Sequence, residues 1–179
     1  MLDPEQAALA IVDVQGRLAQ LMADRETLFA NLQRMVRGAR VLGLPILWAE
    51  QNPAGLGPTI PELTALLEGE TPISKMTFSC LGSAEFVAAL EAAGRRQVLL
   101  TGIEAHICVY HTAADLLARG YEVQVVEDAV GARVAGNKRV GVSRMCAAGA
   151  VLTSTEMALF EMMRSAEHPR FREIQAIVK

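Results

Sequence analysis

Apolar runs without polar–apolar alternation are the feature of this sequence that most restricts its fold. A strand that alternates is half-exposed, whereas a strand buried on both faces of a sheet is apolar throughout. Each run is followed by a loop or by a stretch whose apolar residues recur at helical spacing. This order predicts a parallel sheet covered by helices on both faces. The runs expected to form strands are 7–14, 44–49, 98–100, 122–130 and 150–153.

Four of the helical stretches are followed by a glycine, which suits a helix end. Asp24 and Ser83 stand at the starts of two stretches, and we expect them to act as N-caps. The expected helices cover 24–42, 83–93, 106–119, 137–148 and 155–166.

The tail, residues 168–179, also has helical spacing and carries an apolar stripe of Phe171, Ile174 and Ile177. Such a stripe needs burial, either on the core of its own chain or on a second subunit. We expect a homo-oligomer, most simply a dimer, in which this stripe is covered.

The composition restricts the class of function. A chain of 179 residues, of which 51% are hydrophobic, suits one domain with a full core. The net charge is −3 and no Lys/Arg cluster exceeds two or three residues, so we expect no nucleic-acid partner. Without a membrane-length apolar run or a signal-peptide pattern, we expect no membrane partner and a cytoplasmic location. Three cysteines without CxxC spacing argue against a disulfide framework and a zinc cluster.

Cys108 lies where a buried run gives way to a helical stretch. Ligands of open α/β sheets bind at the carboxyl ends of strands. A helix N-terminus adds unpaired N–H groups and a partial positive charge, which favour a nucleophilic thiolate. Position alone leaves a second interpretation open, because many free cysteines are small buried hydrophobes.

Two charged residues also stand apart from their surroundings. Asp13 lies at the end of the first apolar run, where an unpaired charge is costly. Its alternative role is to cap the following helix. Lys75 lies in a mainly uncharged segment close to Phe78, and its alternative is an ordinary solvated side chain.

Asp13, Lys75 and Cys108, in this order, resemble the isochorismatase-like cysteine hydrolases, a group that includes nicotinamidases and N-carbamoylsarcosine amidohydrolase. The resemblance spans nearly the whole chain and is strongest to the isochorismatase domain-containing branch. It implies one hydrolase domain over 1–179, with a three-layer α/β/α Rossmann-like fold and a mainly parallel six-stranded sheet. The matching segments are Ile11 to Gln15, Lys75, Gly102 to Val109, Glu50 to Thr59 and His168 to Gln175.

The resemblance implies a mechanism. Cys108 is the nucleophile that attacks an amide-like or carbamoyl carbonyl, Asp13 accepts and returns the proton, and Lys75 favours the thiolate. A pKa near 6 would make Cys108 mostly thiolate at pH 7, and a cation together with a helix N-terminus could supply that shift. The family also carries a cis peptide bond, here between Ile103 and Glu104. The backbone N–H groups of Glu104 and Cys108 are then expected to form an oxyanion hole.

The partner implied by the resemblance is a small-molecule substrate. The pocket that receives it is expected to include Gln15, Glu50, Gln51, Phe78 and Ile103.

One departure from the family concerns metal ions. Nicotinamidases have an Asp-x-His metal motif after the second strand, where this chain reads Ala49-Glu50-Gln51-Asn52. We therefore expect a metal-independent enzyme without a cofactor, and neither nicotinamide nor isochorismate is supported as the substrate.

Three alternatives stay open at this point. The chain could be a non-catalytic binding or scaffold protein that keeps the fold. It could be a redox thiol protein in which Cys80 or Cys146 resolves an oxidised Cys108. His106 is a rival general base, since it lies two residues from Cys108.

Overall fold

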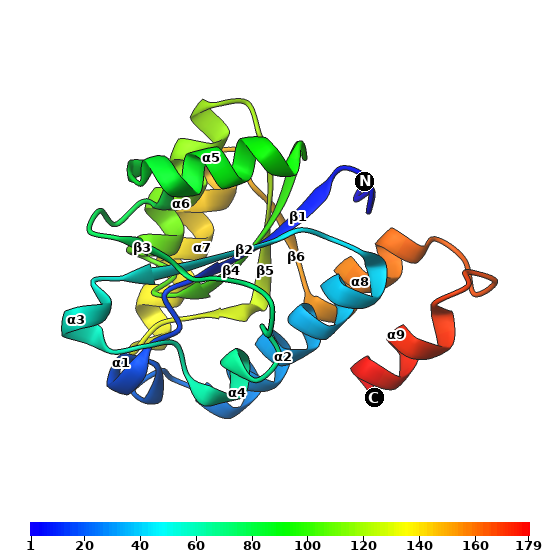
Figure 1. Cartoon of the computed structure of the whole chain (residues 1–179), viewed down its shortest axis with the longest axis horizontal. Helices are drawn as coiled ribbons and strands as arrows, with labels where there is room; N and C mark the ends of the chain where they lie inside the picture. The colour runs from blue at the N-terminus through cyan, green and yellow to red at the C-terminus, as the bar shows by residue number, and fades with distance from the viewer.

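A six-stranded sheet forms the centre of the protein in the computed structural model, which describes residues 1–179 (Figure 1). The strand order is β3-β2-β1-β4-β5-β6, and every pair of neighbours is parallel. The predicted parallel sheet is thus confirmed. The strands are β1 (Ala7–Val12), β2 (Ile46–Gln51), β3 (Ile73–Lys75), β4 (Gln97–Ile103), β5 (Glu122–Gly131) and β6 (Val151–Thr153).

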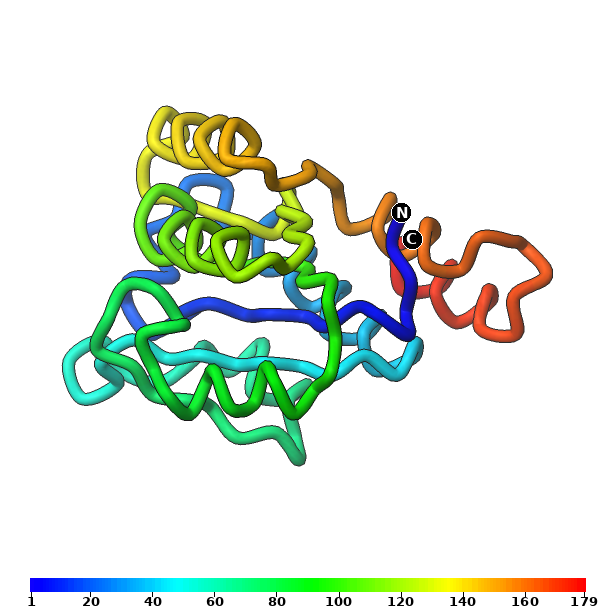
Figure 2. Tube along the Cα trace, turned by 90° about the horizontal axis from the view of Figure 1, so that it is seen from above, coloured from blue at the N-terminus to red at the C-terminus, as the bar shows by residue number.

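Helices cover both faces of this sheet. The larger helices α2, α8 and α9 lie on one face, and α5, α6 and α7 lie on the other (Figure 1). Figure 2 looks onto the second layer and shows α5, α6 and α7 arranged in chain order. The helices are α1 (Gly16–Gln20), α2 (Arg25–Leu42), α3 (Pro53–Leu56), α4 (Pro61–Thr64), α5 (Ala84–Ala93), α6 (Cys108–Ala118), α7 (Ala135–Ala147), α8 (Thr155–Met163) and α9 (Phe171–Val178), with a 3₁₀ turn η1 (Cys80–Gly82).

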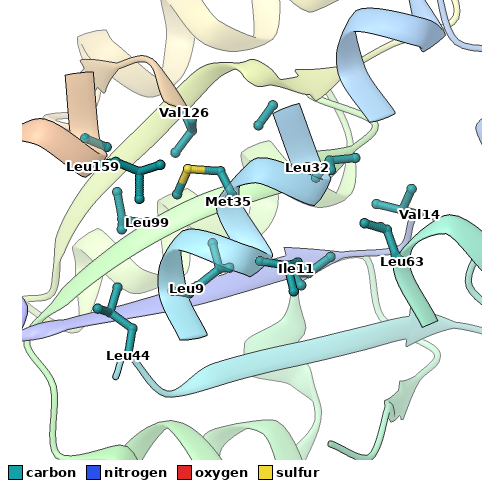
Figure 3. Close-up of a cluster of buried hydrophobic side chains, with 14 of the residues drawn as sticks. Leu9, Ile11, Val14, Leu32, Met35, Leu44, Leu63, Leu99, Val126 and Leu159 are labelled. Carbon is teal, nitrogen blue, oxygen red and sulfur yellow. The ribbon is translucent and has the colours of Figure 1, made fainter. Parts of the chain in front are cut away.

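Two hydrophobic cores, one on each face, explain why the central strands are apolar throughout. The core under α2 contains 27 buried residues and the core under α6 contains 21. Leu9 and Ile11 of β1 face the first core, where they meet Met35 of α2 (Figure 3). Ala10 and Val12, at the alternate positions of the same strand, face the second core. All six residues of β1 are buried as a result.

The sequence pattern missed one strand and shortened another. β3 has only three residues at the edge of the sheet, which is too short for a period to be recognised. β4 continues past Leu100 to Ile103, because Thr101 and Gly102 pair with Ile11 and Val12 of β1.

Helix ends follow the sequence signals in part. The Ser83 side chain accepts a hydrogen bond from the Phe86 N–H, as expected of an N-cap. Asp24 is not an N-cap in this sense, because its φ of 51° is left-handed and its side chain accepts no capping hydrogen bond. Gly43 ends α2 with a φ of 71°, a conformation that glycine adopts without a Cβ penalty.

The apolar stripe of the tail packs on the core of its own chain. Ile174 is fully buried, and Phe171 and Ile177 pack beside it against the first core. Phe171 also meets Phe160 of α8, with ring centroids 6.1 Å apart. The stripe therefore packs on its own chain, which is the first of the two alternatives, and its burial does not require a second subunit. None of the helices combines the length and apolarity that a membrane crossing needs.

Candidate active site

The candidate residues lie at the carboxyl ends of four adjacent strands, β3, β2, β1 and β4 (Figure 1). Asp13 follows β1, Lys75 is the last residue of β3, and Cys108 is the first residue of α6, after β4. The carboxyl ends of parallel strands lie on the same side of the sheet, and open α/β sheets bind their ligands there. The sheet thereby joins Asp13 to Lys75 across 62 positions of sequence.

Asp13 and Lys75 form a buried ion pair. The Lys75 Nζ atom lies 2.7 Å from the Asp13 Oδ2 atom, and both side chains are almost fully buried. Nζ also donates toward three further acceptors, so the interpretation of Lys75 as a solvated side chain is excluded. Those acceptors are Gln51 Oε1 at 2.8 Å and the backbone carbonyls of Thr77 and Phe78, each at 3.2 Å.

The backbone of Asp13 adopts an unusual conformation. Its φ of 54° is left-handed, and its N–H donates to the Ala49 carbonyl at 3.1 Å. Asp tolerates this region better than most residues, and such backbones concentrate at functional sites. The alternative of helix capping does not hold, because Gln15 occupies the N-cap of α1. The Asp13 Oδ1 atom is buried and has no partner at ordinary hydrogen-bond geometry, and the Cys108 thiol lies close to this carboxylate.

The electrostatics of Cys108 differ from the sequence-based expectation. Burial raises the pKa of the Cys108 thiol, and the negative charge of Asp13 raises it further, while Lys75 acts in the opposite direction. These influences favour the protonated thiol and do not favour the thiolate that the sequence led us to expect. Burial is the largest cause, and the influence of the Lys75 cation is offset by the Asp13 carboxylate paired with it.

The pKa of the Asp13 carboxyl is shifted as well. Burial raises its pKa above the ordinary value of 3.8, and the Lys75 ammonium opposes this shift. Asp13 and Cys108 also lie close enough for each to change the pKa of the other. A carboxyl whose pKa moves toward neutrality is better suited to general base chemistry than an unperturbed one.

The segment that joins β4 to α6 supplies two backbone donors. The peptide bond between Ile103 and Glu104 is cis. Neither the Glu104 N–H nor the Cys108 N–H donates to a backbone carbonyl. The Glu104 carboxylate is held by Arg133, whose backbone N–H donates to Oε2 at 2.9 Å and whose Nε donates to Oε1 at 3.0 Å.

A small pocket of about 130 Å³ opens beside Asp13 and Cys108. Most of its wall is apolar. Three of the five residues expected to form it, Gln51, Phe78 and Ile103, do so. The complete lining is Asp13, Leu18, Gln51, Leu56, Phe78, Ile103, Glu104, Ile107 and Cys108.

Gln15 and Glu50 do not line the pocket, which corrects the sequence-based expectation. The Gln15 side chain is fully buried and clamps the backbone of Gln51 and Gly57 through its amide group. Glu50 accepts hydrogen bonds from the N–H and the hydroxyl of Thr59, at 2.7 Å each. Both residues fasten the loop after β2 to its surroundings.

Leu18, Leu56 and Ile107 are pocket residues that the sequence did not reveal. Leu18 belongs to α1 and Leu56 to the short helix α3, and both elements follow strands that end on this side of the sheet. No spacing rule distinguishes them from ordinary core leucines, because the course of their loops is set by tertiary contacts.

The remaining candidates lie outside the pocket. His106 contacts Asn137 through its Nε2 atom, and its Nδ1 atom has no partner. Cys80 is fully buried, and burial raises its pKa to about 12. Cys146 lies on α7, and His111 stacks near Phe78 with ring centroids 5.9 Å apart. No group of three or more His, Cys, Asp and Glu residues is arranged to hold a metal ion.

Comparison with known proteins agrees with this architecture. The Isochorismatase domain model matches residues 7–157. Isochorismatase domain-containing protein 2A of Mus musculus is 41% identical over 98% of this chain and 84% of its own length.

Solved structures share the whole fold. The MAR1 ribonuclease of Caenorhabditis elegans has a TM-score of 0.93 at 35% identity, over 99% of this chain and 91% of its own. YcaC from Pseudomonas aeruginosa, with hexane-2,5-diol and covalent acrylamide, has a TM-score of 0.93 at 28% identity, over 99% and 89%. YcaC of Escherichia coli, described as an octameric hydrolase of unknown specificity, has a TM-score of 0.89 at 26% identity, over 98% and 94%. The chain belongs to the isochorismatase-like hydrolase family.

Proposed function

We propose that this protein is a metal-independent cysteine hydrolase that cleaves the C–N bond of a small amide or carbamoyl compound. One observation carries the proposal: Asp13 is held by Lys75 through Oδ2, its Oδ1 atom has no partner, and the Cys108 thiol lines the same pocket. This combination is a nucleophile beside an oriented base.

The reaction begins with the thiol proton. Asp13 takes it as the Cys108 sulfur attacks the substrate carbonyl carbon, and a tetrahedral oxyanion forms. The C–N bond then breaks as Asp13 returns the proton to the leaving nitrogen, which leaves a thioester on Cys108. Water attacks the thioester while Asp13 accepts its proton, and that proton passes to the departing thiolate.

Two groups support these steps without forming bonds to the substrate carbon. The N–H groups of Glu104 and Cys108 are the donors proposed for the oxyanion, and they have no competing backbone acceptor. Lys75 holds the Asp13 carboxylate in one orientation and offsets part of the cost of its burial. We regard Lys75 as a positioning residue for this reason.

Relatives support a reactive site of this kind. The P. aeruginosa protein carries covalent acrylamide, and the E. coli protein is described as a hydrolase. A net charge of −3 and a pocket of about 130 Å³ do not favour an RNA substrate for this chain, although the C. elegans relative is a ribonuclease.

Acrylamide labelling followed by peptide mass spectrometry tests the nucleophile. We expect Cys108 to be alkylated faster than Cys146, and Asp13→Asn to slow labelling at Cys108 alone, because only Cys108 depends on that base. Cys146, which is half-buried and distant from Asp13, is the internal control. Faster labelling of Cys146, or equal labelling of Cys108 in both proteins, would contradict the assignment and favour a non-catalytic scaffold.

Ammonia release from a panel of small amides tests turnover. We expect activity in the wild-type protein, no activity in Cys108→Ala, and no change after chelation and buffer exchange, since Asp13, Lys75 and Cys108 supply every proposed step. If chelation removed activity and a divalent metal restored it, the mechanism would be wrong even with the fold unchanged.

We also propose that the chain forms a homo-oligomer. The octameric E. coli relative supports this, and so do exposed apolar side chains at the β6 edge of the sheet. Val151, Leu152 and Met157 are each between 46% and 60% exposed. Monomeric proteins seldom leave such a cluster uncovered.

A further inference from the structure

We infer that the substrate is a carboxamide whose acyl group is small, apolar and uncharged, and that substrates bearing a carboxylate are rejected. The inference rests on the proposed function, because it assumes that the substrate carbonyl lies against Cys108. It goes further by assigning a chemical class from the atoms that the pocket leaves unsatisfied.

The polar side chains around the pocket are mostly occupied by one another. The Lys75 ammonium has three protons and faces four acceptors, so it has no donor to spare for a ligand. The Gln51 side chain accepts from Lys75 and donates to the Met76 carbonyl at 2.9 Å. Both oxygens of Glu104 are bound by Arg133, which does not line the pocket. No free cation therefore faces the ligand.

The atoms that remain form a specific pattern. The N–H groups of Glu104 and Cys108 are two free donors, the Gln51 amide keeps a second N–H, and the Asp13 Oδ1 atom is a buried acceptor beside the Cys108 thiol. A carboxamide complements this set, because its oxygen accepts from the N–H groups of Glu104 and Cys108 while its own N–H donates to the lone pair of the Asp13 Oδ1 atom that does not face the Cys108 thiol. An ester or a ketone lacks that donor and leaves the buried Asp13 carboxylate with one hydrogen bond fewer, which is costly.

The apolar pocket wall determines which acyl group the substrate can carry. Five side chains, Leu18, Leu56, Phe78, Ile103 and Ile107, supply its apolar surface. A carboxylate placed against them would lose its hydration without gaining a partner, and it would also lie near the charge of Asp13.

The size of the pocket limits how much of the acyl group is enclosed, because the pocket is open on one side. Its volume of about 130 Å³ holds roughly four groups of the size of water, at ~30 Å³ each. Acyl groups of three or four carbons fit this limit. Each additional methylene that stays inside the pocket should raise kcat/KM by about fourfold.

Matched alkylating agents test the charge preference directly. Iodoacetamide and iodoacetate are similar in size and differ in charge, and each rate at Cys108 is divided by the rate at the same cysteine in the urea-unfolded chain. We expect the normalised iodoacetamide rate to exceed the iodoacetate rate by at least about tenfold, because one charge is excluded from an apolar wall. Equal normalised rates, or a preference for iodoacetate, would overturn the inference.

Matched substrates extend the test to turnover. Isobutyramide and malonamate have similar size, and ammonia release should give a kcat/KM at least about tenfold higher for isobutyramide. The variant Leu18→Arg adds a cation to the wall, and we expect it to raise relative activity on malonamate and relative labelling by iodoacetate.

The outcomes separate this inference from the proposed function. Rapid alkylation of Cys108 together with equal or faster turnover of malonamate would overturn the substrate class and leave the cysteine mechanism standing. Normalised rates at or below one for both alkylating agents, with no amide hydrolysed, would overturn the proposed function and this inference with it.

Discussion

At the residue scale, the proposed chemistry depends on the Asp13 carboxylate, whose burial has a high desolvation free energy. Asp13 and Lys75 lie side by side in the interior at 2.7 Å, and such pairs repay their desolvation only with good geometry and additional hydrogen bonds. Lys75 has those additional bonds, whereas the Oδ1 atom of Asp13 has none. The unsatisfied atom is the one that the proposed reaction uses.

Replacement of Asp13 by Asn should lower kcat/KM by about 10²- to 10⁴-fold, because the proton acceptor is lost. The fold should persist, since the Asn amide oxygen can still accept from Lys75. Steady-state kinetics and circular dichroism of the same preparation measure both effects. Wild-type activity in this variant would contradict the role of Asp13, and His106→Ala tests the rival base.

The pH profile of the wild-type enzyme should report the same carboxyl. Asp13 must be ionised to accept the proton, so activity falls as pH falls through its pKa. Because burial raises that pKa, the midpoint of the acid limb should lie above 3.8. A kcat/KM profile against pH measures it, and a midpoint at or below 3.8 would be inconsistent with a buried base.

Lys75→Met should destabilise the protein by about 3–5 kcal/mol at pH 7, because it leaves the buried Asp13 carboxylate without its cation. Lys138→Met is the matched control, since Lys138 pairs with Glu127 at the surface and such pairs contribute about 1 kcal/mol or less. Urea denaturation of the three proteins measures the differences. Equal losses in both variants would contradict the buried pair.

The same variant has a pH signature with a definite sign. Removal of Lys75 removes the influence that lowers the pKa of Asp13, so the folded-state pKa rises further above 3.8. The folded state then binds a proton more tightly than the unfolded state, and stability is lost as pH rises through that pKa. The free energy of unfolding of Lys75→Met should therefore increase as pH is lowered from 7 toward 5, relative to wild type.

At the scale of elements, the close contact of β1 with β4 positions the site. Gly102 pairs with Val12, immediately before Asp13, and its φ is 113°. A Cβ atom at Gly102 would overlap the backbone carbonyl oxygen of Val12. Only glycine lets the two strands approach at this point, where both lead into site residues.

Gly102→Ala should lower stability by clearly more than Gly43→Ala. Gly43 also has a left-handed φ, of 71°, but nothing lies within 4 Å of its Cβ position, so its cost is about 1 kcal/mol of backbone preference. Gly102→Ala adds a backbone clash to that cost. Denaturation midpoints compare the two variants, and similar losses would show that the contact with β1 relaxes easily.

At the scale of the whole molecule, the two edges of the sheet differ. The β3 edge holds Lys75 and leads to Phe78 at the pocket, while the β6 edge presents exposed apolar residues distant from it. The β3 strand therefore contributes residues to the site, and the β6 strand belongs to the surface that we propose for oligomer contacts.

Light scattering should therefore give a mass that is a multiple of the 19.3 kDa chain. Leu152→Glu should reduce that mass by placing a charge in the proposed interface, whereas Leu21→Glu, at a similarly exposed leucine after α1, should not. A wild-type monomer at micromolar concentration would refute the assembly, and an unchanged mass in Leu152→Glu would place the contact elsewhere.

The sequence by itself determined the layered architecture and the set of candidate residues. Uninterrupted apolar runs report burial on both faces, and glycines report helix ends, because both depend on the local chain. Asp13 and Cys108 could be placed at strand ends from this pattern. The family resemblance added Lys75 as their partner and the sixth strand.

Only the tertiary structure decided the charge state and the shape of the site. The pKa of Cys108 depends on Asp13 and on burial, so the positive field of Lys75 and a helix N-terminus was not sufficient to predict it. The apolar stripe around Ile174 is buried by a core that is built from segments distant in the sequence. Gln15 and Glu50 form hydrogen bonds with residues distant in the sequence, and these bonds hold both side chains away from the pocket. A local pattern reports which side of an element is buried, whereas a pKa, a pocket wall or a buried contact depends on atoms that only the fold brings together.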